Sequence, residues 1–155
     1  PVGLRRINKT TRDFAAMDRH PLRDAPDRFR ALVAAAPGSQ HLLGLTMVSE
    51  LFAADGWEVR VEVASTEDAL FAAVQGSRYD VLGLSVGLGE QLPTLADLVA
   101  RLRARSLNPG MAVLLGGVAL TTPEPTTETY GADAVCHDPV AAIRVARRLA
   151  MRLPQ

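Results

Sequence analysis

From residue 28 onward, the spacing of apolar residues alternates between two patterns. Short apolar runs, typical of strands buried in a sheet, are separated by longer stretches whose apolar residues recur at helical spacing. The short runs predict strands at 28–36, 79–86, 111–115 and 134–137, and an alternating, valine-rich stretch predicts another at 57–64. The longer stretches predict helices at 42–55, 68–75, 93–106 and 125–130, with a last helix that opens at 138–139.

Turn and capping residues separate these elements. Gly56 follows the first helix, in the position where glycine commonly ends a helix. Ser65-Thr66-Glu67 supplies an N-cap for the second helix. At the last helix, Asp138 is the expected N-cap and Pro139 the expected first helical residue. The element boundaries predicted from periodicity therefore agree with local backbone chemistry.

Five strands that alternate with helices predict a parallel sheet covered on both faces. Right-handed crossovers make this a flavodoxin-like, Rossmann-type doubly wound sheet, with strand order 2-1-3-4-5. In such a sheet, ligands bind outside the carboxyl ends of the strands. Residues 37–44, 85–89 and 116–117 all follow strands near that crevice, so we expect them to lie close together.

Residues 1–27 differ from the rest of the chain. They are rich in arginine and aspartate and lack sustained periodicity, which predicts an arm or linker with one short helix near 11–19. Residues 28–155 are expected to form one folded domain. Because the chain starts at Pro1 without a methionine, we expect the natural protein to be longer.

Composition narrows the classes of partner. The 17 basic residues equal the 17 acidic residues, so no global charge favours direct binding to nucleic acid or an acidic membrane. The apolar runs are too short to cross a bilayer, and no secretion signal opens the chain. The single cysteine, Cys136, excludes an internal disulfide and fits a reducing compartment. We expect a cytoplasmic protein.

Candidate chemistry centres on His41, in the stretch Ser39-Gln40-His41-Leu42-Leu43-Gly44. A histidine on this loop is placed to coordinate a metal, but it also suits a helix N-terminus bonded to backbone. Two other segments follow at defined distances. Forty residues separate Gly44 from Ser85-Val86-Gly87, and 28 more precede Gly116-Gly117. The glycine pair alone is equally typical of a simple turn after the fourth strand.

Together these segments resemble the cobalamin-binding domain, whose signature is Asp-x-His-x-x-Gly, about forty residues, Ser-x-Leu, fewer than thirty residues, and Gly-Gly. The resemblance implies that His41 is the lower axial ligand to cobalt and that Ser85 binds the nucleotide tail buried in the crevice. It also implies a set of residues that approach the ligand: Ser39, Gln40, Gly44, Gly87, Gly89, Gly116 and Gly117.

Two positions depart from that signature. Ser39 stands where the family has aspartate, and Gly87 stands where it has leucine. A histidine bound to a metal usually donates its second N–H to a carboxylate or carbonyl, which orients the ring and strengthens its donation. Serine accepts that bond without a charge, so the axial bond should be more labile. Glycine opens the pocket wall.

A narrower stretch, from Pro37 to Leu45 with Gly56-Trp57, is similar to a subgroup found in photosynthesis antirepressors of purple bacteria. This resemblance implies a sensory domain that binds cobalamin or haem, responds to light or redox state, and acts on transcription through a regulator protein. Cys136-His137 lies near the same crevice, where a Cys or a His is a potential ligand for haem iron; the alternative is that Cys136 is a buried strand residue and His137 a polar loop residue.

We expect no catalysis by this chain alone, because a catalytic corrinoid domain presents its cofactor to a separate substrate domain. Two alternatives stay open. One is a corrinoid carrier domain of a methyltransferase or mutase. The other is a degenerate scaffold that has lost its ligand and serves only protein interaction. Binding of a tetrapyrrole separates the last from the others.

Overall fold

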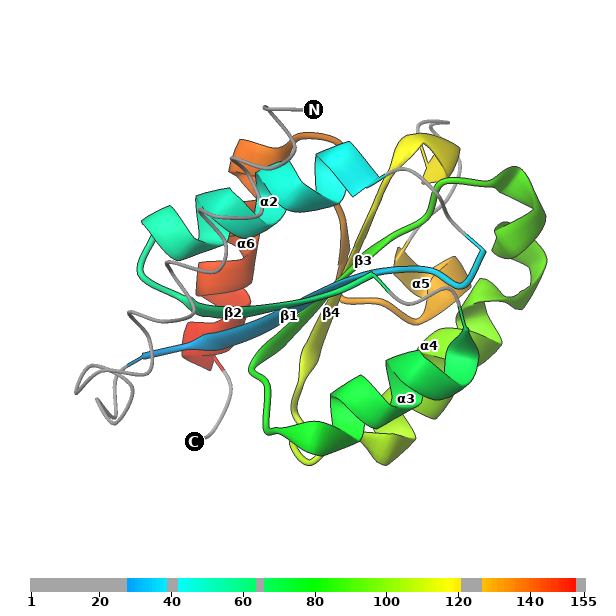
Figure 1. The fold of residues 1–155 in the computed structure, drawn as a ribbon, viewed down its shortest axis with the longest axis horizontal. Coiled ribbons are helices and arrows are strands. Elements are labelled where there is room, and N and C mark those ends of the chain that lie inside the picture. The colour runs from blue at the N-terminus through cyan, green and yellow to red at the C-terminus, as the bar shows by residue number, and fades with distance from the viewer. Residues whose placement is uncertain (1–27, 39–41, 64–65, 121–126, 153–155) are drawn as a thin grey trace.

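The predicted doubly wound sheet is confirmed. The computed structural model describes residues 28–38, 42–63, 66–120 and 127–152, and the predicted arm with its short helix lies outside them. Five parallel strands form one sheet in the order β2-β1-β3-β4-β5 (Figure 1). The strands are β1 (Arg30–Ala35), β2 (Glu58–Glu62), β3 (Val81–Ser85), β4 (Ala112–Gly116) and β5 (Ala134–Val135).

Helices cover both faces of the sheet. The elements are α2 (Leu42–Ala54), α3 (Glu67–Gly76), α4 (Leu92–Arg105), α5 (Thr127–Tyr130) and α6 (Pro139–Arg152), with short 3-10 helices η2 (Gly89–Gln91) and η3 (Val118–Leu120). In Figure 1, α2 and α6 lie on one side of the sheet, and α3, α4 and α5 lie on the other. Both faces of the sheet are therefore covered, as in a doubly wound fold.

Alternate residues of the strands enter two separate cores. Leu32, Leu82 and Val113 pack toward α3 and α4, and Val33, Val81 and Leu114 pack toward α2 and α6. All six side chains are at most 4% exposed. Burial on both faces explains why β1, β3 and β4 have continuous apolar runs, whereas the edge strand β2 alternates and is only partly buried.

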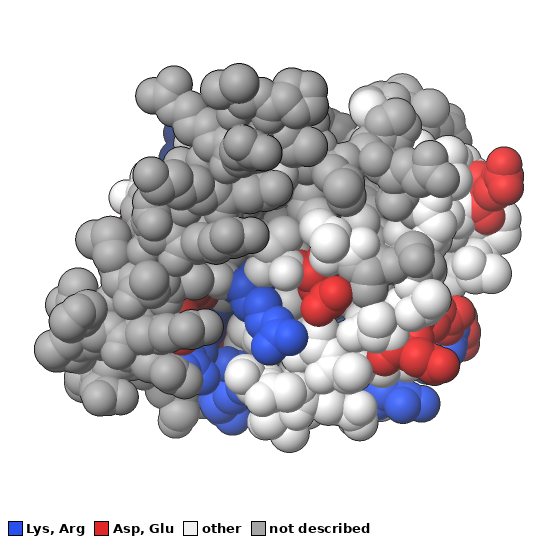
Figure 2. All heavy atoms as spheres, viewed as in Figure 1, with Lys and Arg blue, Asp and Glu red and all other residues white. Residues whose placement is uncertain are grey.

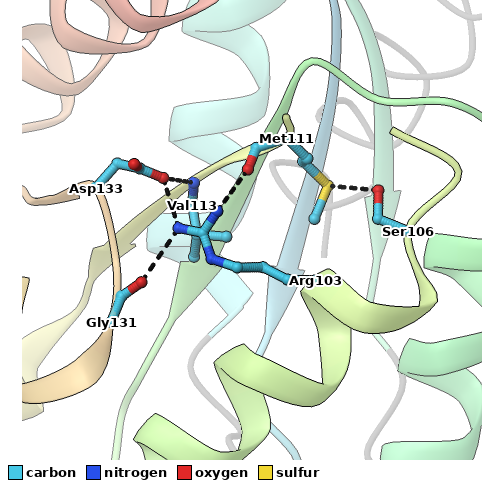
Figure 3. A network of polar contacts seen from close by, with 6 residues as sticks. All are labelled: Arg103, Ser106, Met111, Val113, Gly131 and Asp133. Carbon is cyan, nitrogen blue, oxygen red and sulfur yellow. Dashed lines mark hydrogen bonds and ion pairs between the residues drawn. The ribbon is translucent and has the colours of Figure 1, made fainter. Parts of the chain in front are cut away.

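The fifth strand is shorter than the predicted 134–137, and side chains hold its edge in place. The guanidinium of Arg103 donates to the carbonyls of Met111 (2.8 Å) and Gly131 (3.1 Å) and to the carboxylate of Asp133 (2.6 Å) (Figure 3). The same Asp133 carboxylate accepts the backbone N–H of Val113 at 2.8 Å. These contacts hold the chain just before β5 against β4.

Charges on the surface are mixed. On the face in Figure 2, basic and acidic side chains of the described residues lie among one another rather than in separate patches. Arg101 shows the local pattern: it pairs with Glu67 at 2.6 Å and with Asp97 at 2.8 Å, and these contacts raise its pKa. Around Arg101, basic and acidic side chains are therefore paired with each other.

Candidate ligand-binding site

A hollow in the sheet lies beneath α2 and α6. In the strand register, Gly83 sits between Val33 of β1 and Leu114 of β4, on the face that carries the α2–α6 core. A Cβ built on Gly83 would meet no atom within 4 Å. The missing side chain in the middle strand therefore leaves open space in an otherwise filled row.

Small residues on the helices face this hollow. Gly44 of α2 and Ala142 of α6 both line it, and a Cβ on Gly44 would also meet no atom within 4 Å. The result is a cavity of about 270 Å³. It is lined by Val33, Gly44, Leu45, Val48, Phe52, Gly83, Leu84, Ser85, Leu114, Leu115, Gly116, Gly117, Val118, Cys136, His137, Asp138, Pro139 and Ala142.

The cavity wall is apolar inside and polar at the carboxyl edge of the sheet. Along α2, Val48 and Phe52 follow Gly44 at one-turn intervals and present an apolar surface. Ser85 ends β3, and Cys136 and His137 follow β5. Burial raises the pKa of the Cys136 thiol, which keeps it neutral at ordinary pH. Polar groups thus collect where a ligand would enter.

The Gly116-Gly117 turn is both a chain reversal and part of the cavity wall. Gly117 has φ +108°, and a Cβ there would lie 2.3 Å from the carbonyl oxygen of Val86. The backbone N–H of Val86 donates to Gly116 at 2.8 Å, and Ala119 donates to the carbonyl of Val86 at 3.1 Å. Only glycine lets the end of β4 pack against the end of β3 this closely.

Four predicted site residues come together at the cavity: Gly44, Ser85, Gly116 and Gly117. Gly87 and Gly89 lie in the connection from β3 to α4 and do not line it. Ser39, Gln40 and His41 fall outside the described residues, so their roles stay predictions. His41 directly precedes Leu42, the first residue of α2.

Sequence reasoning placed Cys136 and His137 near the crevice, and both line the cavity. It missed Gly83. A single glycine inside a run of buried apolar residues was the available signal, because glycine within a strand often marks the close approach of a ligand or backbone. The sequence could not show that Val48 and Phe52 line a cavity, because that depends on Gly83 across the sheet.

The described residues offer no ready-made multidentate metal site. Within them, no three His, Cys, Asp or Glu side chains gather to hold a metal ion. One carboxylate near the cavity, Asp138, has a structural task, because it accepts the backbone N–H of Val140 at 3.1 Å at the start of α6. Over the same residues, no helix is both long and apolar enough to cross a bilayer.

Two solved structures illustrate the similarity of this fold to known proteins. A cobalamin-binding protein from Desulfitobacterium hafniense DCB-2 is 25% identical, with a TM-score of 0.69 over 87% of this chain and 64% of that one. The monomethylamine corrinoid protein of Methanosarcina barkeri is 20% identical, with a TM-score of 0.66 over 90% and 63%. The chain therefore spans less than two thirds of either protein.

A search of curated proteins found no match. The family model for the B12 binding domain matches residues 29–145, which is most of the chain and includes all five strands. The match also takes in every residue that lines the cavity. This chain belongs to the B12 binding domain family.

Proposed function

We propose that this chain binds a corrinoid at the carboxyl edge of the sheet and serves as a sensory domain. The observation that carries the proposal is the cavity left open by Gly44 and Gly83 beneath α2 and α6. At about 270 Å³ it is smaller than the sites of roughly 300–1,000 Å³ that hold drug-sized molecules. A corrin ring is too large for this cavity. The ring therefore stays outside, and only the nucleotide tail of the corrinoid enters.

The residues present fit a corrinoid better than haem. A corrinoid carries an elongated nucleotide tail, which can enter the cavity while the ring stays outside. Haem has no such tail and would leave the space at Gly83 unfilled. The edge hydroxyl of Ser85 is placed to bond the tail, while Val48 and Phe52 exclude water from it. His41 is the proposed axial ligand, on the loop that leads into α2.

When bound, a corrinoid supplies a cobalt centre whose axial ligands respond to redox state and light. The chain's own contribution is to hold the tail and to set the strength of the lower ligand. As the proposed acceptor for the His41 ring, Ser39 would carry no charge, which would favour a labile axial bond. A labile bond suits a sensor of light or redox state, acting through a transcriptional regulator as an antirepressor does.

A corrinoid carrier is the second candidate, and one observation favours it. The fold of the monomethylamine corrinoid protein covers 90% of this chain. In a carrier, the same tail pocket would serve to present cobalt to a separate methyltransferase or mutase. The two functions share a ligand and differ in what the loaded domain does next.

Absorbance titration tests the ligand. The purified chain is mixed with hydroxocobalamin, with cobinamide (which lacks the nucleotide) and with haemin. We expect hydroxocobalamin to bind with a spectral shift that His41→Ala removes and His137→Ala preserves. His137 is the matched control because it lines the cavity wall. Ser39→Asp should tighten the axial bond. Binding of none of these ligands would support the degenerate scaffold instead.

A second experiment separates sensor from carrier. The chain loaded with a light-sensitive alkylcobalamin is compared in darkness and after illumination by gel filtration and limited proteolysis. A sensor should change its hydrodynamic size or cleavage pattern on photolysis, and His41→Ala should not. A carrier should instead lose the methyl group of methylcobalamin to a thiol when a corrinoid methyltransferase is added in darkness.

A further inference from the structure

The inner wall of the cavity offers no unpaired polar group. Val33 and Leu114 flank Gly83 on the sheet, and Leu45, Val48 and Phe52 stand opposite on α2. The strand backbone around them is paired in the parallel ladders. Across the residues that the structure describes, no buried side-chain nitrogen or oxygen lacks a hydrogen-bond partner. A group that reaches Gly83 therefore meets only apolar surface.

We propose that this cavity selects among corrinoids by the nucleotide base, accepting benzimidazole or phenol and discriminating against adenine. The inference rests on the proposed corrinoid binding. Natural corrinoids differ in this base. Adenine brings an exocyclic amine and several ring nitrogens, and each polar group buried without a partner weakens binding. A phenolic base brings none of these, and dimethylbenzimidazole brings a single free nitrogen and two methyl groups.

Polar groups at the carboxyl edge do not remove this discrimination. Ser85 ends β3 two residues beyond Gly83, so its hydroxyl lies at the mouth, where the ribose and phosphate of a tail would pass. Cys136 also lies at this edge, and its thiol is a weak donor that burial keeps protonated. The polar end of the cavity therefore suits the polar part of the tail, and the apolar end suits the base.

Gly83 is the residue that sets the space for the base. A Cβ added to Gly83 would meet no atom within 4 Å, and the φ angle of Gly83 is not positive. A side chain is therefore acceptable there both sterically and conformationally. A valine at this position would project between Val33 and Leu114 and occupy the cavity floor. The base, if it binds here, must then be displaced.

Dissociation constants for four corrinoids test the selection. The wild-type chain is titrated with cresolyl, dimethylbenzimidazolyl and adeninyl cobamides and with cobinamide. The dimethylbenzimidazolyl–adeninyl comparison is the sharper one, since both bases carry a nitrogen that can coordinate cobalt in the free corrinoid, whereas cresol carries none. We expect adeninyl cobamide to bind about 10–100-fold more weakly than dimethylbenzimidazolyl cobamide, the range that an apolar pocket achieves against a polar analogue. Equal or tighter binding of adeninyl cobamide overturns the inference, whereas binding of no corrinoid overturns the proposed function as well.

Gly83→Val locates the base. We expect this variant to bind cresolyl cobamide as weakly as cobinamide, with cobinamide affinity unchanged. Gly83→Ala should give a smaller loss and covers the case in which valine prevents folding. Gly76→Ala, at the end of α3, is the matched control, because its Cβ also meets open space but far from the cavity lining. Unchanged base preference in both Gly83 variants would place the base elsewhere and overturn the inference.

Discussion

The side-chain amide of Gln91 joins two loops at the carboxyl edge of the sheet, because its Nε2 donates to the carbonyl of Pro37 after β1. The same nitrogen lies 3.4 Å from the carbonyl of Ala36, and the Oε1 of Gln91 accepts the N–H of Leu88 at 3.1 Å. Gln91 thus connects the end of β1 with the loop that follows β3. His41, the proposed axial ligand, follows Pro37 by four positions in the sequence.

Replacing Gln91 by alanine should loosen this connection. The carbonyls of Ala36 and Pro37 and the N–H of Leu88 would lose their partner, so we expect the free energy of unfolding to fall by about 1–2 kcal/mol in a denaturant titration. Gln91→Glu should not restore it, since an ionised carboxylate accepts from Leu88 but cannot donate to the carbonyls. Equal stability of wild type and both variants would contradict the connecting role.

A side chain at Gly117 should destabilise the fold severely, whereas a side chain at Gly116 should destabilise it much less. In Gly117→Ala the new Cβ would lie 2.3 Å from the carbonyl oxygen and 2.7 Å from the nitrogen of Val86, at φ +108°. Backbone atoms cannot rotate away, so we expect a loss of more than about 3 kcal/mol or failure to fold. In Gly116→Ala the nearest atom, the carbonyl oxygen of Cys136, is 3.2 Å away, which predicts a much smaller loss.

Thermal unfolding of the two alanine variants measures this difference. A melting temperature for Gly117→Ala close to that of Gly116→Ala would show that the turn can shift away from β3. Circular dichroism of each variant distinguishes destabilisation from a changed fold. The comparison bears on the binding site directly, since both glycines line the cavity.

The sheet was predictable because β1, β3 and β4 are buried on both faces, which leaves apolar runs, and because β-α alternation fixes parallel order. The place of Ser85 at a strand end followed from the same pattern. The cavity was not predictable, since it depends on which residues share a row across the sheet. Gly83 is opposite Val33 and Leu114 only once the register is known.

The contacts at the start of β5 show a second limit of sequence reasoning. The carboxylate of Asp133, directly before β5, bonds the N–H of Val113 and the guanidinium of Arg103. Such contacts depend on residues 20 and 30 positions away. Periodicity within one segment carries no information about it.

Asp55 and Arg147 should couple the two helices that wall the cavity. The Oδ2 of Asp55, just after α2, accepts Nε (3.1 Å) and Nη2 (2.9 Å) of Arg147 in α6, and also the indole N–H of Trp57 at 3.1 Å. The pair is partly exposed, so a double-mutant cycle with alanine should give a coupling of about 0.5–1 kcal/mol. Asp55→Ala should cost more than Arg147→Ala, because the buried Trp57 loses its partner as well.

Urea unfolding of wild type, both single variants and the double variant supplies the cycle. If the double variant loses the sum of the unfolding free energies lost by the two single variants, the coupling is zero and the contact does not hold α2 to α6. Hydroxocobalamin affinity of the same variants then reports whether the spacing of the two helices matters to the ligand. If both Asp55→Ala and Arg147→Ala bind hydroxocobalamin more weakly than wild type, the Asp55–Arg147 contact affects the binding cavity.

Cys136 gives a chemical probe of the cavity, because it is the only cysteine of the chain and lines the wall. Burial raises the pKa of its thiol, so the thiolate fraction at neutral pH is below that of a free thiol, whose pKa is about 8.5. We expect alkylation by iodoacetamide to be slower in the folded chain than in urea. Its rate should continue to rise at pH values where a free thiol is already fully ionised.

The same shift makes stability depend on pH. The unfolded thiol loses its proton at lower pH than the folded thiol, so the contribution of Cys136 is intact below the unfolded pKa and declines as pH rises through the folded one. Cys136→Ala should remove that decline, which urea titrations from pH 7 to pH 10 would measure. Adding hydroxocobalamin should slow alkylation further, since a tail in the cavity covers the thiol. Unchanged alkylation in the presence of bound hydroxocobalamin would place the tail away from Cys136.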